Sequence, residues 1–427
     1  MPARNSSRRS FVKLVAAAPL LSQIAARNLY AHAATAIGKD PRQNVYTRLG
    51  VKTVINCRGT WTYLSGSLEF PEVLQAQAEA SQYFVNMLDL QRAVGRRLAQ
   101  LTGAESGIVT SGSAGAMAAA TAGCMAGTDD KYIWQLPDTT GLKHEVIMMG
   151  GRSAFDSAIR LTGAKLILAY SPEELANAIN DNTAMIYTTN LGDKLQKELA
   201  VAKDHKIPLM LDDAAGIPPA DNAKLYARMG IDLYAFSGGK GLRGPQCSGL
   251  LLGRKDLIEA ALLNCSPREG AVCRPMKVGK EEVIGCLTAL ETWLSIDEKK
   301  LYAEWNGRVD RIRKLVDTVP GVKTDIYTPD DGNRYPTLKV SWDQQAWGFT
   351  LSDCAQKLKE EDPIIEVVGI DNPSLVKAVR EGNPNRKERH TPDHIELVSM
   401  TIKPGEEIIV GQRLRAILSA AQKKAQG

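Results

Sequence analysis

A lysine in a glycine-rich segment is the residue of this chain best suited to chemistry. Lys240 lies between two apolar runs, 233–236 and 249–252, and glycines occupy positions 238, 239, 241 and 244 of the connecting loop. Glycine allows a backbone to adopt positive φ and to approach a ligand closely. A lysine partly withdrawn from water loses basicity and becomes a nucleophilic amine that can form a Schiff base. We therefore take Lys240 as the candidate catalytic residue.

An acid at the end of another apolar run is the second candidate. Asp212 follows the run 209–211 and precedes Asp213. A buried carboxylate is costly unless a cation pairs with it, and a protonated pyridine nitrogen is such a cation. Neighbouring residues of a strand point to opposite faces, so only one of the two acids should face a ligand. The alternative is that both acids cap the next helix.

The third candidate is a turn rich in serine and glycine. Ser111, Gly112 and Ser113 follow the strand-like run 107–110 and begin a helical run of small residues that extends to Met125. Backbone N–H groups and hydroxyls at a helix N-terminus bind anions such as phosphate. A phosphate-type turn, an aspartate and a lysine 28 residues after it, in this order, are what a pyridoxal phosphate site requires.

The elements that would position these residues alternate along the chain. Alternating strands and helices predict an α/β fold with a mostly parallel, doubly wound sheet. Ligands in such folds lie at the carboxyl ends of strands, where the three candidate turns fall. Strands are expected at 53–56, 145–149, 165–169, 185–189, 209–211, 233–236 and 249–252, and helices at 72–101, 156–162, 172–179 and 195–205.

The chain is expected to form two domains after an N-terminal leader. Residues 40–275 would be the large cofactor-binding domain with an N-terminal arm, and residues 276–315 a connecting helix. Residues 316–427 would be a smaller C-terminal α+β domain with strands at 337–342, 364–368 and 395–399 and a closing helix at 406–422.

The chain resembles the fold-type I pyridoxal-phosphate enzymes of the selenocysteine synthase-like group, and within that group the D-glucosaminate-6-phosphate ammonia-lyase type. The resemblance runs from about residue 45 to near the C-terminus. The matching segments include 54–56, 88–91, 101–105, 110–113, 124–127, 152–156, 158–160, 163–165, 212, 218–219, 236–240, 244–246, 274–281 and 404–406.

The resemblance assigns roles to individual positions. Lys240 would bond to pyridoxal 5'-phosphate and then act as base or acid, and Asp212 would hold the pyridine nitrogen protonated. Either Arg152 or Phe155 stands where the residue that packs on the cofactor ring is expected. The phosphate would be bound by Ser111, Gly112, Ser113 and Ser237, and the substrate by Asn56 and Arg274.

Some of these positions have plainer explanations. Arg274 could be a surface arginine, although a guanidinium suits a substrate carboxylate or phosphate. The pairs Gln91–Arg92 and Arg96–Arg97 could reach the site of a neighbouring subunit or form a solvated helix face.

The cofactor is indicated more firmly than the reaction. The resemblance favours a lyase that removes a β-substituent from an amino acid or amino-sugar acid and releases a keto acid and ammonia. A racemase or aminotransferase would use the same anchors, and a non-catalytic protein could retain the fold. A selenocysteine synthase-like transferase is disfavoured, because that family has an acid before the lysine and an uncharged residue at the position of Arg243. No GxGxxG follows a first strand, which argues against a dehydrogenase.

The N-terminus resembles a twin-arginine export signal. Arg8 and Arg9 precede a short apolar run, 14–21, and small residues offer cleavage sites after Ala33 or Ala36. A disordered basic tail is the alternative. Residues 1–36 are therefore expected to direct export to the periplasm or beyond, with no membrane segment left after cleavage.

Charge and cysteine content exclude other classes. The formal net charge is +5, but residues 1–36 carry five basic residues and no acid, which leaves 48 basic and 48 acidic residues in the rest. No whole-protein charge attracts nucleic acid, so we expect a small-molecule substrate. The seven cysteines show no metal-like spacing, and we predict no metal site and mostly structural thiols. A homo-oligomer is expected because active sites of fold-type I enzymes usually lie at subunit boundaries.

Overall fold

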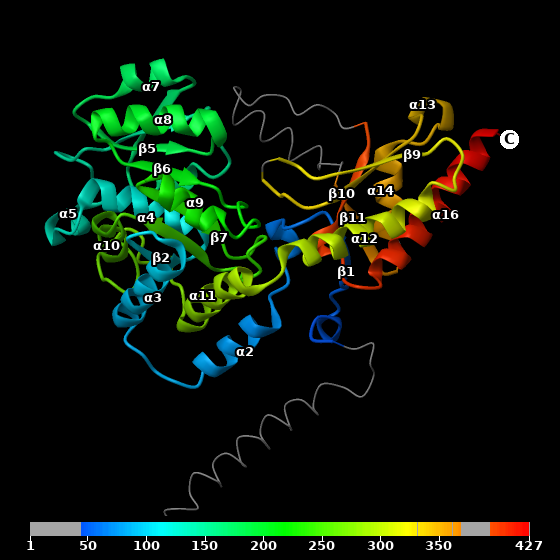
Figure 1. Cartoon of the computed structure of the whole chain (residues 1–427), viewed down its shortest axis with the longest axis horizontal. Helices are drawn as coiled ribbons and strands as arrows, with labels where there is room; N and C mark the ends of the chain where they lie inside the picture. Colours follow the sequence, from blue (N-terminus) through cyan, green and yellow to red (C-terminus); the bar gives the residue numbers. More distant parts are fainter. Residues whose placement is uncertain (1–43, 331, 361, 369–392, 427) are drawn as a thin grey trace, which may run out of the picture. The chain divides into compact units, whose positions relative to one another are not determined.

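The computed structural model describes residues 44–330, 332–360, 362–368 and 393–426 (Figure 1). The chain divides into one small unit, residues 1–55 with 360–364, and one large unit, residues 56–359 with 365–427. In the small unit the described residues are 44–55, 360 and 362–364, which include the turn η1 (Thr47–Leu49) and the beginning of β1 (Val54–Cys57). The export signal predicted for residues 1–36 lies outside the described residues.

A seven-stranded sheet forms the centre of the large unit. Its strand order is β2-β8-β7-β6-β5-β3-β4, and every neighbouring pair is parallel except the two that β8 makes. The mostly parallel α/β fold expected from the sequence is confirmed. The strands are β2 (Ser106–Thr110), β3 (Glu145–Met149), β4 (Lys165–Ala169), β5 (Thr183–Thr188), β6 (Leu209–Asp212), β7 (Leu233–Ser237) and β8 (Gly249–Gly253).

Strand register brings the candidate turns to one edge of this sheet. Thr110 pairs with Gly249, and Gly249 pairs with Ser237. Asp212 pairs with Ala235 on the neighbouring strand. Because β2, β6 and β7 run in the same direction, the turns that follow them all leave the sheet at its carboxyl edge.

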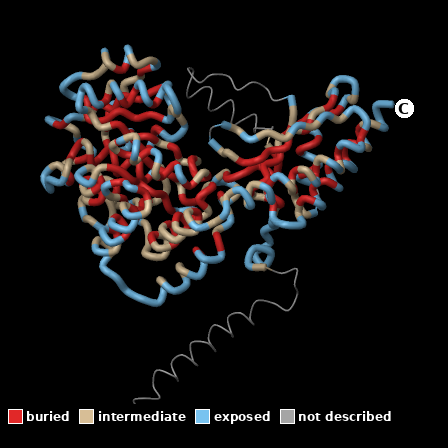
Figure 2. The backbone as a smooth tube through the Cα atoms, in the orientation of Figure 1, coloured by how far each residue is buried: buried red, intermediate tan, exposed pale blue. Residues whose placement is uncertain are grey.

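Helices cover both faces of the sheet, as a buried parallel sheet requires. Leu209 and Leu211 face the core shared with α3, α8, α9 and α11, whereas Met210 faces the core shared with α4 and α10. Figure 2 shows the buried strands between these layers. The helices are α2 (Pro71–Ala80), α3 (Met87–Thr102), α4 (Gly112–Ala126), α5 (Asp130–Gln135), α6 (Ser157–Arg160), α7 (Pro172–Ala178), α8 (Gly192–His205), α9 (Asn222–Met229), α10 (Lys255–Leu263) and α11 (Lys280–Ser295), with the short turn η2 (Thr62–Leu64).

Small side chains allow α4 to pack closely inside the protein. Eleven of its fifteen residues are buried. A Cβ atom at Gly123 would lie only 2.8 Å from the backbone nitrogen of Ala261 in α10. This tight packing fixes the helix whose N-terminus carries the Ser111–Ser113 turn.

Two long helical patterns are each divided into two helices. The pattern 72–101 gives α2 and α3, and the Asn86 side chain accepts hydrogen bonds from the backbone N–H groups of Leu88 (3.0 Å) and Asp89 (3.2 Å) to begin the second. The single connecting helix expected at 276–315 is instead two helices, α11 and α12 (Glu298–Val316), with Asp297 capping α12 by accepting from Lys300 N–H at 3.1 Å. At both places a side-chain cap therefore starts a new helix, which interrupts the continuous helix that the apolar pattern predicts.

The C-terminal part contains an antiparallel sheet with helices. Strand β10 (Thr337–Ser341) pairs with β12 (Ile395–Val398) on one side and with β9 (Lys323–Tyr327) on the other. Strand β9 was not expected from the sequence. Strand β11 (Ile364–Val367) pairs with β1, and the remaining elements are α13 (Gln344–Trp347), α14 (Leu351–Glu360), η3 (Ser399–Thr401) and α16 (Glu406–Gln426). Among the described residues, none of the helices has the length and apolar character needed to cross a bilayer.

Candidate active site

The loop that carries Lys240 is packed so closely that glycine is required for space. A Cβ atom at Gly239 would lie 2.8 Å from Cα of Gln246, and one at Gly238 would lie 2.9 Å from the carbonyl oxygen of Pro245. Positive φ does not explain the glycines of this loop, because the loop residue with a positive φ is Arg243, at 56°. The loop is further held where Ser67 N–H donates to the Gly239 carbonyl at 3.0 Å.

Lys240 lies beside two acids in a poorly solvated position. Its side chain is half-buried, and loss of solvation lowers the pKa of the amine, while the charges of Asp212 and Asp213 oppose the shift. A lowered pKa leaves more of the amine unprotonated at neutral pH. The nucleophilic amine expected from the sequence is consistent with this environment.

Asp212 points to the α4 face of the sheet with one oxygen unpaired. Its Oδ2 accepts a hydrogen bond from Tyr187 Oη at 2.9 Å. Its Oδ1 is buried, and within the described part of the chain it has no hydrogen-bond partner of normal geometry. Burial raises the pKa of Asp212, while Tyr187, Lys240 and the nearby Ala214 N–H act against the rise. A buried acceptor beside the lysine is what a protonated ring nitrogen of pyridoxal phosphate would need, so these residues fit that cofactor.

Asp213 points the other way and serves the fold. Its Oδ2 accepts a hydrogen bond from Tyr226 Oη of α9 at 2.6 Å. The two acids therefore diverge as the strand pattern predicts. Neither occupies the N-cap position of α9, which belongs to Asp221, so the capping alternative is wrong.

The serine–glycine turn stands at the N-terminus of α4. Ser111 occupies the N-cap position, its side chain makes no capping hydrogen bond, and Gly112 has φ of 79°. Strand β8 passes directly behind the turn, since a Cβ atom at Gly249 would lie 2.5 Å from the Gly112 carbonyl carbon and 2.7 Å from Ser113 N. The turn is thus held rigidly, with the N-terminus of a fifteen-residue helix free to bind an anion.

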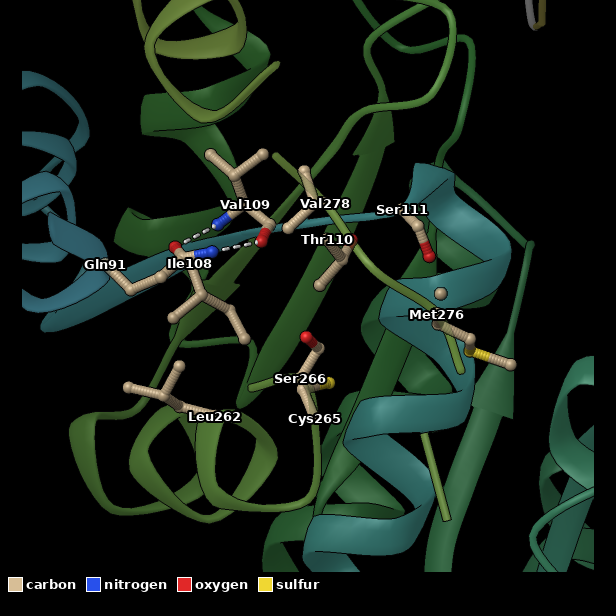
Figure 3. Close-up of a pocket in the computed structure, with 11 residues that line it drawn as sticks. Gln91, Ile108, Val109, Thr110, Ser111, Leu262, Cys265, Ser266, Met276 and Val278 are labelled. Carbon is tan, nitrogen blue, oxygen red and sulfur yellow. Dashed lines mark hydrogen bonds between the residues drawn. The ribbon is translucent and has the colours of Figure 1, made fainter. Parts of the chain in front are cut away.

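A small cavity of about 10 Å³ lies behind this turn (Figure 3). It is lined by Ser111 together with Cys265 and Ser266 from the segment after α10. Figure 3 also shows Gln91, whose amide donates to the Val109 carbonyl at 2.7 Å and accepts from Val109 N–H at 3.0 Å. Strand β2 is the outermost strand at one edge of the sheet, and Gln91 pairs with backbone groups on its open side. Gln91 therefore has a structural role within its own chain.

Arg152 and Phe155 lie in the segment after β3, at the same edge of the sheet. Arg152 donates to Asp156 through Nε and, at 3.1 Å, through Nη2. Asp156 also influences Tyr187, whose pKa is raised by burial and by the charges of Asp212 and Asp156. Phe155 is 60% exposed. The segment thus lies near Asp212, and which of the two residues packs on the cofactor stays a prediction.

The remaining candidates are placed differently. Ser237 ends β7 just before the lysine loop, and its N–H donates to the Ala214 carbonyl at 2.9 Å. Asn56 uses its side chain within its own turn, donating to the Gly59 carbonyl at 3.0 Å and accepting from Arg58 N–H at 2.9 Å. A substrate would have to displace these bonds. Arg274 is half-buried, and its role stays a prediction.

Tyr187 is the site residue that the sequence pattern did not reveal. It lies on β5, where it pairs with Met210 of β6, and its hydroxyl reaches the aspartate two positions further along that strand. An aromatic residue in a strand is ordinarily read as core. Only the pairing of β5 with β6 would have identified it.

Relatives of known activity share most of the chain. A 5'-C-glycyluridine monooxygenase-decarboxylase from Streptomyces sp is 30% identical over 339 residues, covering 75% of this chain and 83% of that protein. D-Glucosaminate-6-phosphate ammonia lyase from Salmonella typhimurium (strain 14028s / SGSC 2262) is 28% identical over 333 residues, covering 74% and 87%. An L-seryl-tRNA(Sec) selenium transferase from Aquifex aeolicus (strain VF5) is 24% identical over 271 residues, covering 55% and 56%.

Comparison of the fold with solved structures also finds the ammonia-lyase. A solved structure of D-glucosaminate-6-phosphate ammonia-lyase superposes with a TM-score of 0.72 at 26% identity, covering 89% of this chain and 99% of that one. No protein-family model matches the chain. The chain belongs to the fold-type I pyridoxal-phosphate enzymes, in the selenocysteine synthase-like family that includes the D-glucosaminate-6-phosphate ammonia-lyases.

Proposed function

We propose that this protein is a pyridoxal-phosphate-dependent lyase that acts on an amino acid or amino-sugar acid and releases ammonia and a keto acid. The observation that carries the proposal is the buried Asp212 with an unpaired oxygen, next to a lysine of lowered pKa. The similarity to D-glucosaminate-6-phosphate ammonia-lyase in sequence and in fold supports the choice of reaction.

The site residues have separate roles in this reaction. Bound pyridoxal phosphate supplies an aldehyde that condenses with amines and a protonated ring that accepts electrons. Lys240 provides the amine that holds the cofactor, and after its release it can take or return a proton at the substrate carbon. Asp212 keeps the ring nitrogen protonated, and Ser111, Gly112 and Ser113 bind the phosphate at the N-terminus of α4.

A second candidate reaction is oxidative decarboxylation of an amino acid. It is favoured by the similarity to the Streptomyces monooxygenase-decarboxylase, at 30% identity. The two reactions differ in their products and in their need for oxygen. A lyase releases ammonia and keto acid without oxygen, whereas a monooxygenase-decarboxylase consumes oxygen and releases carbon dioxide.

A substrate screen separates these candidates. The purified protein with pyridoxal phosphate is incubated with D- and L-amino acids and with amino-sugar acids, including D-glucosaminate with and without its 6-phosphate. Ammonia and keto acid formed equally in air and under nitrogen support the lyase. Oxygen uptake with carbon dioxide release supports the second candidate. Inversion without ammonia or keto acid would contradict both and favour a racemase, and Lys240→Ala is the control for each reaction.

We further propose that the protein is a homo-oligomer. Apolar residues in α2 and in the loop that follows it are exposed, notably Leu74 in the helix and Tyr83, Phe84 and Val85 in the loop. Exposed apolar residues grouped in this way are typical of protein–protein interfaces. Sedimentation of the purified protein should give a multiple of the chain mass, and Phe84→Glu should shift it toward the monomer. A monomeric wild-type protein at micromolar concentration would contradict the proposal.

Export by the twin-arginine pathway remains a proposal supported by Arg8 and Arg9 and the apolar run after them. Fractionation of cells that express the full chain should place the protein outside the cytoplasm. Replacing both arginines with lysine should retain it in the cytoplasm. Equal distribution of the two proteins would contradict the proposal.

A further inference from the structure

Two cysteines of the segment after α10 lie side by side although seven residues separate them in sequence. Cys265 and Cys273 form an isolated parallel β-bridge, and Cys273 N–H donates to the Asn264 carbonyl at 3.3 Å. Backbones paired in this way lie about 5 Å apart. Disulfides join residues whose Cα atoms are about 4.4–6.8 Å apart, so the backbone already has a suitable spacing.

Residues paired across a β-bridge extend their side chains to the same side, so the two thiols lie near each other. The neighbouring Cys273 thiol, together with burial, raises the pKa of Cys265. Cys273 is completely buried, whereas Cys265 is half-buried and lines the cavity behind Ser111 (Figure 3). Cys265 is therefore the less buried residue of the pair and the one expected to react first, with Cys273 positioned to follow.

Neighbouring contacts hold the start and the middle of this segment in place. The Asn264 side chain donates to the Gly127 carbonyl at 3.0 Å and to the Ala260 carbonyl at 2.9 Å. Between the cysteines, Arg268 pairs with Asp130 of α5, and Gly270 lies against the ring of Trp134. The two cysteines are thus presented to each other by a folded segment.

We propose that Cys265 and Cys273 are a disulfide-forming pair that staples the segment between α10 and Arg274. The reaction is thiol–disulfide exchange with a small-molecule disulfide such as oxidised glutathione. A thiolate of one cysteine attacks the reagent and displaces one glutathione thiolate, leaving a mixed disulfide. The thiolate of the second cysteine then displaces the other glutathione. One S–S bond forms in the protein, two cysteine protons are lost, and the reagent is reduced to two thiols.

The position of the pair gives the crosslink a consequence for the site. Cys273 directly precedes Arg274, and Cys265 borders the cavity behind Ser111. The bond would therefore fix the backbone next to a candidate substrate residue and behind the candidate phosphate turn. Because burial and the neighbouring thiol raise the pKa of Cys265, exchange at its sulfur is slow, and the bond serves as a lasting crosslink and not as a fast sensor.

Peptide mapping tests the pair directly. Full-length protein is incubated with oxidised glutathione, its remaining thiols are alkylated under denaturing conditions, and it is digested with trypsin without reduction. Trypsin cuts after Arg268, so the two cysteines fall in separate peptides, 256–268 and 269–277. We expect these peptides joined by a disulfide, two hydrogen masses below the sum of the free peptides. Both peptides recovered in alkylated form, or Cys265 joined to any other cysteine, would overturn the proposal.

Variants distinguish the pair from general thiol reactivity. Cys273→Ser should abolish the joined peptides and leave glutathione on Cys265, whereas Cys247→Ser, at an exposed cysteine, should leave the joined peptides unchanged. Oxidation should also raise the melting temperature of the wild-type protein by a few degrees and leave that of Cys265→Ser unchanged. Because the mapping of the wild-type protein needs no variant, a poorly folding Cys273→Ser would not remove the test.

Discussion

Tyr187 and Asp212 are joined by a hydrogen bond of 2.9 Å, from the tyrosine hydroxyl to Oδ2 of the carboxylate. The bond orients Asp212 so that Oδ1 is the oxygen left for the cofactor. It also acts to lower the pKa of Asp212 against the rise caused by burial. Tyr187 is therefore a positioning residue, since it acts through the carboxylate.

Replacing Tyr187 with phenylalanine should weaken cofactor binding and change its pH dependence. Loss of one hydrogen bond costs about 1 kcal/mol, or about fivefold in affinity. Without this bond the pKa of Asp212 rises further, so the carboxylate is protonated at higher pH. The pH below which cofactor binding weakens, the acidic limb of the binding curve, should therefore be higher than in the wild-type protein. Spectroscopic titration with pyridoxal phosphate across pH measures both effects. Tyr226→Phe, which removes the corresponding bond to Asp213, is the matched control and should leave the limb in place.

Replacing Asp212 and Asp213 with asparagine should affect different properties of the protein. Asp212→Asn removes the charge that faces the ring nitrogen and should weaken cofactor binding roughly 10- to 100-fold. Asp213→Asn lies on the other face and should lower stability toward urea while leaving cofactor affinity unchanged. Equal losses of cofactor affinity in the two variants would contradict the assignment of Asp212.

A methyl group on Gly249 should displace the phosphate turn. Its Cβ would lie 2.5 Å from the Gly112 carbonyl carbon, and overpacking of this kind costs about 1–3 kcal/mol. We expect about tenfold weaker binding of pyridoxal phosphate. In Gly307→Ala the new Cβ meets only Arg311 Nη1, at 3.3 Å, so this helical variant should bind the cofactor normally. Normal binding by Gly249→Ala would show that the turn does not contact the phosphate.

The interactions of Asp156 with Arg152 and Arg160 should make the stability of the protein depend on pH in the acidic range. Burial acts to raise the pKa of Asp156, but hydrogen bonds from Arg152 and Arg160 outweigh it, and the pKa is lowered. A lowered pKa adds stability above the unfolded value, near 4, and that stability is lost as pH falls through the folded pKa. Asp156→Asn should therefore lower the melting temperature at pH 7, and the difference from wild type should shrink below about pH 4. A difference independent of pH would contradict this linkage.

Much of the scaffold could be predicted because strand and helix patterns are local. The strands 145–149 and 165–169 have the predicted bounds, and the turns at Ser111, Asp212 and Lys240 leave the sheet at one edge. The antiparallel direction of β8 and the pairing that brings Tyr187 to Asp212 depend on contacts distant in sequence. The glycines around Lys240 suggest positive φ in the sequence, yet Gly238 and Gly239 are explained by close packing, which cannot be read from residue spacing.

Chemical trapping shows whether pyridoxal phosphate is attached to Lys240, as the site geometry predicts. The protein is incubated with pyridoxal phosphate, treated with borohydride to make the link to the lysine permanent, digested and mapped by mass spectrometry. We predict a single modified lysine, Lys240, and a visible absorption band before reduction that Lys240→Ala abolishes. A protein that stays colourless, or a label spread over other lysines with Lys240 unmodified, would contradict the account.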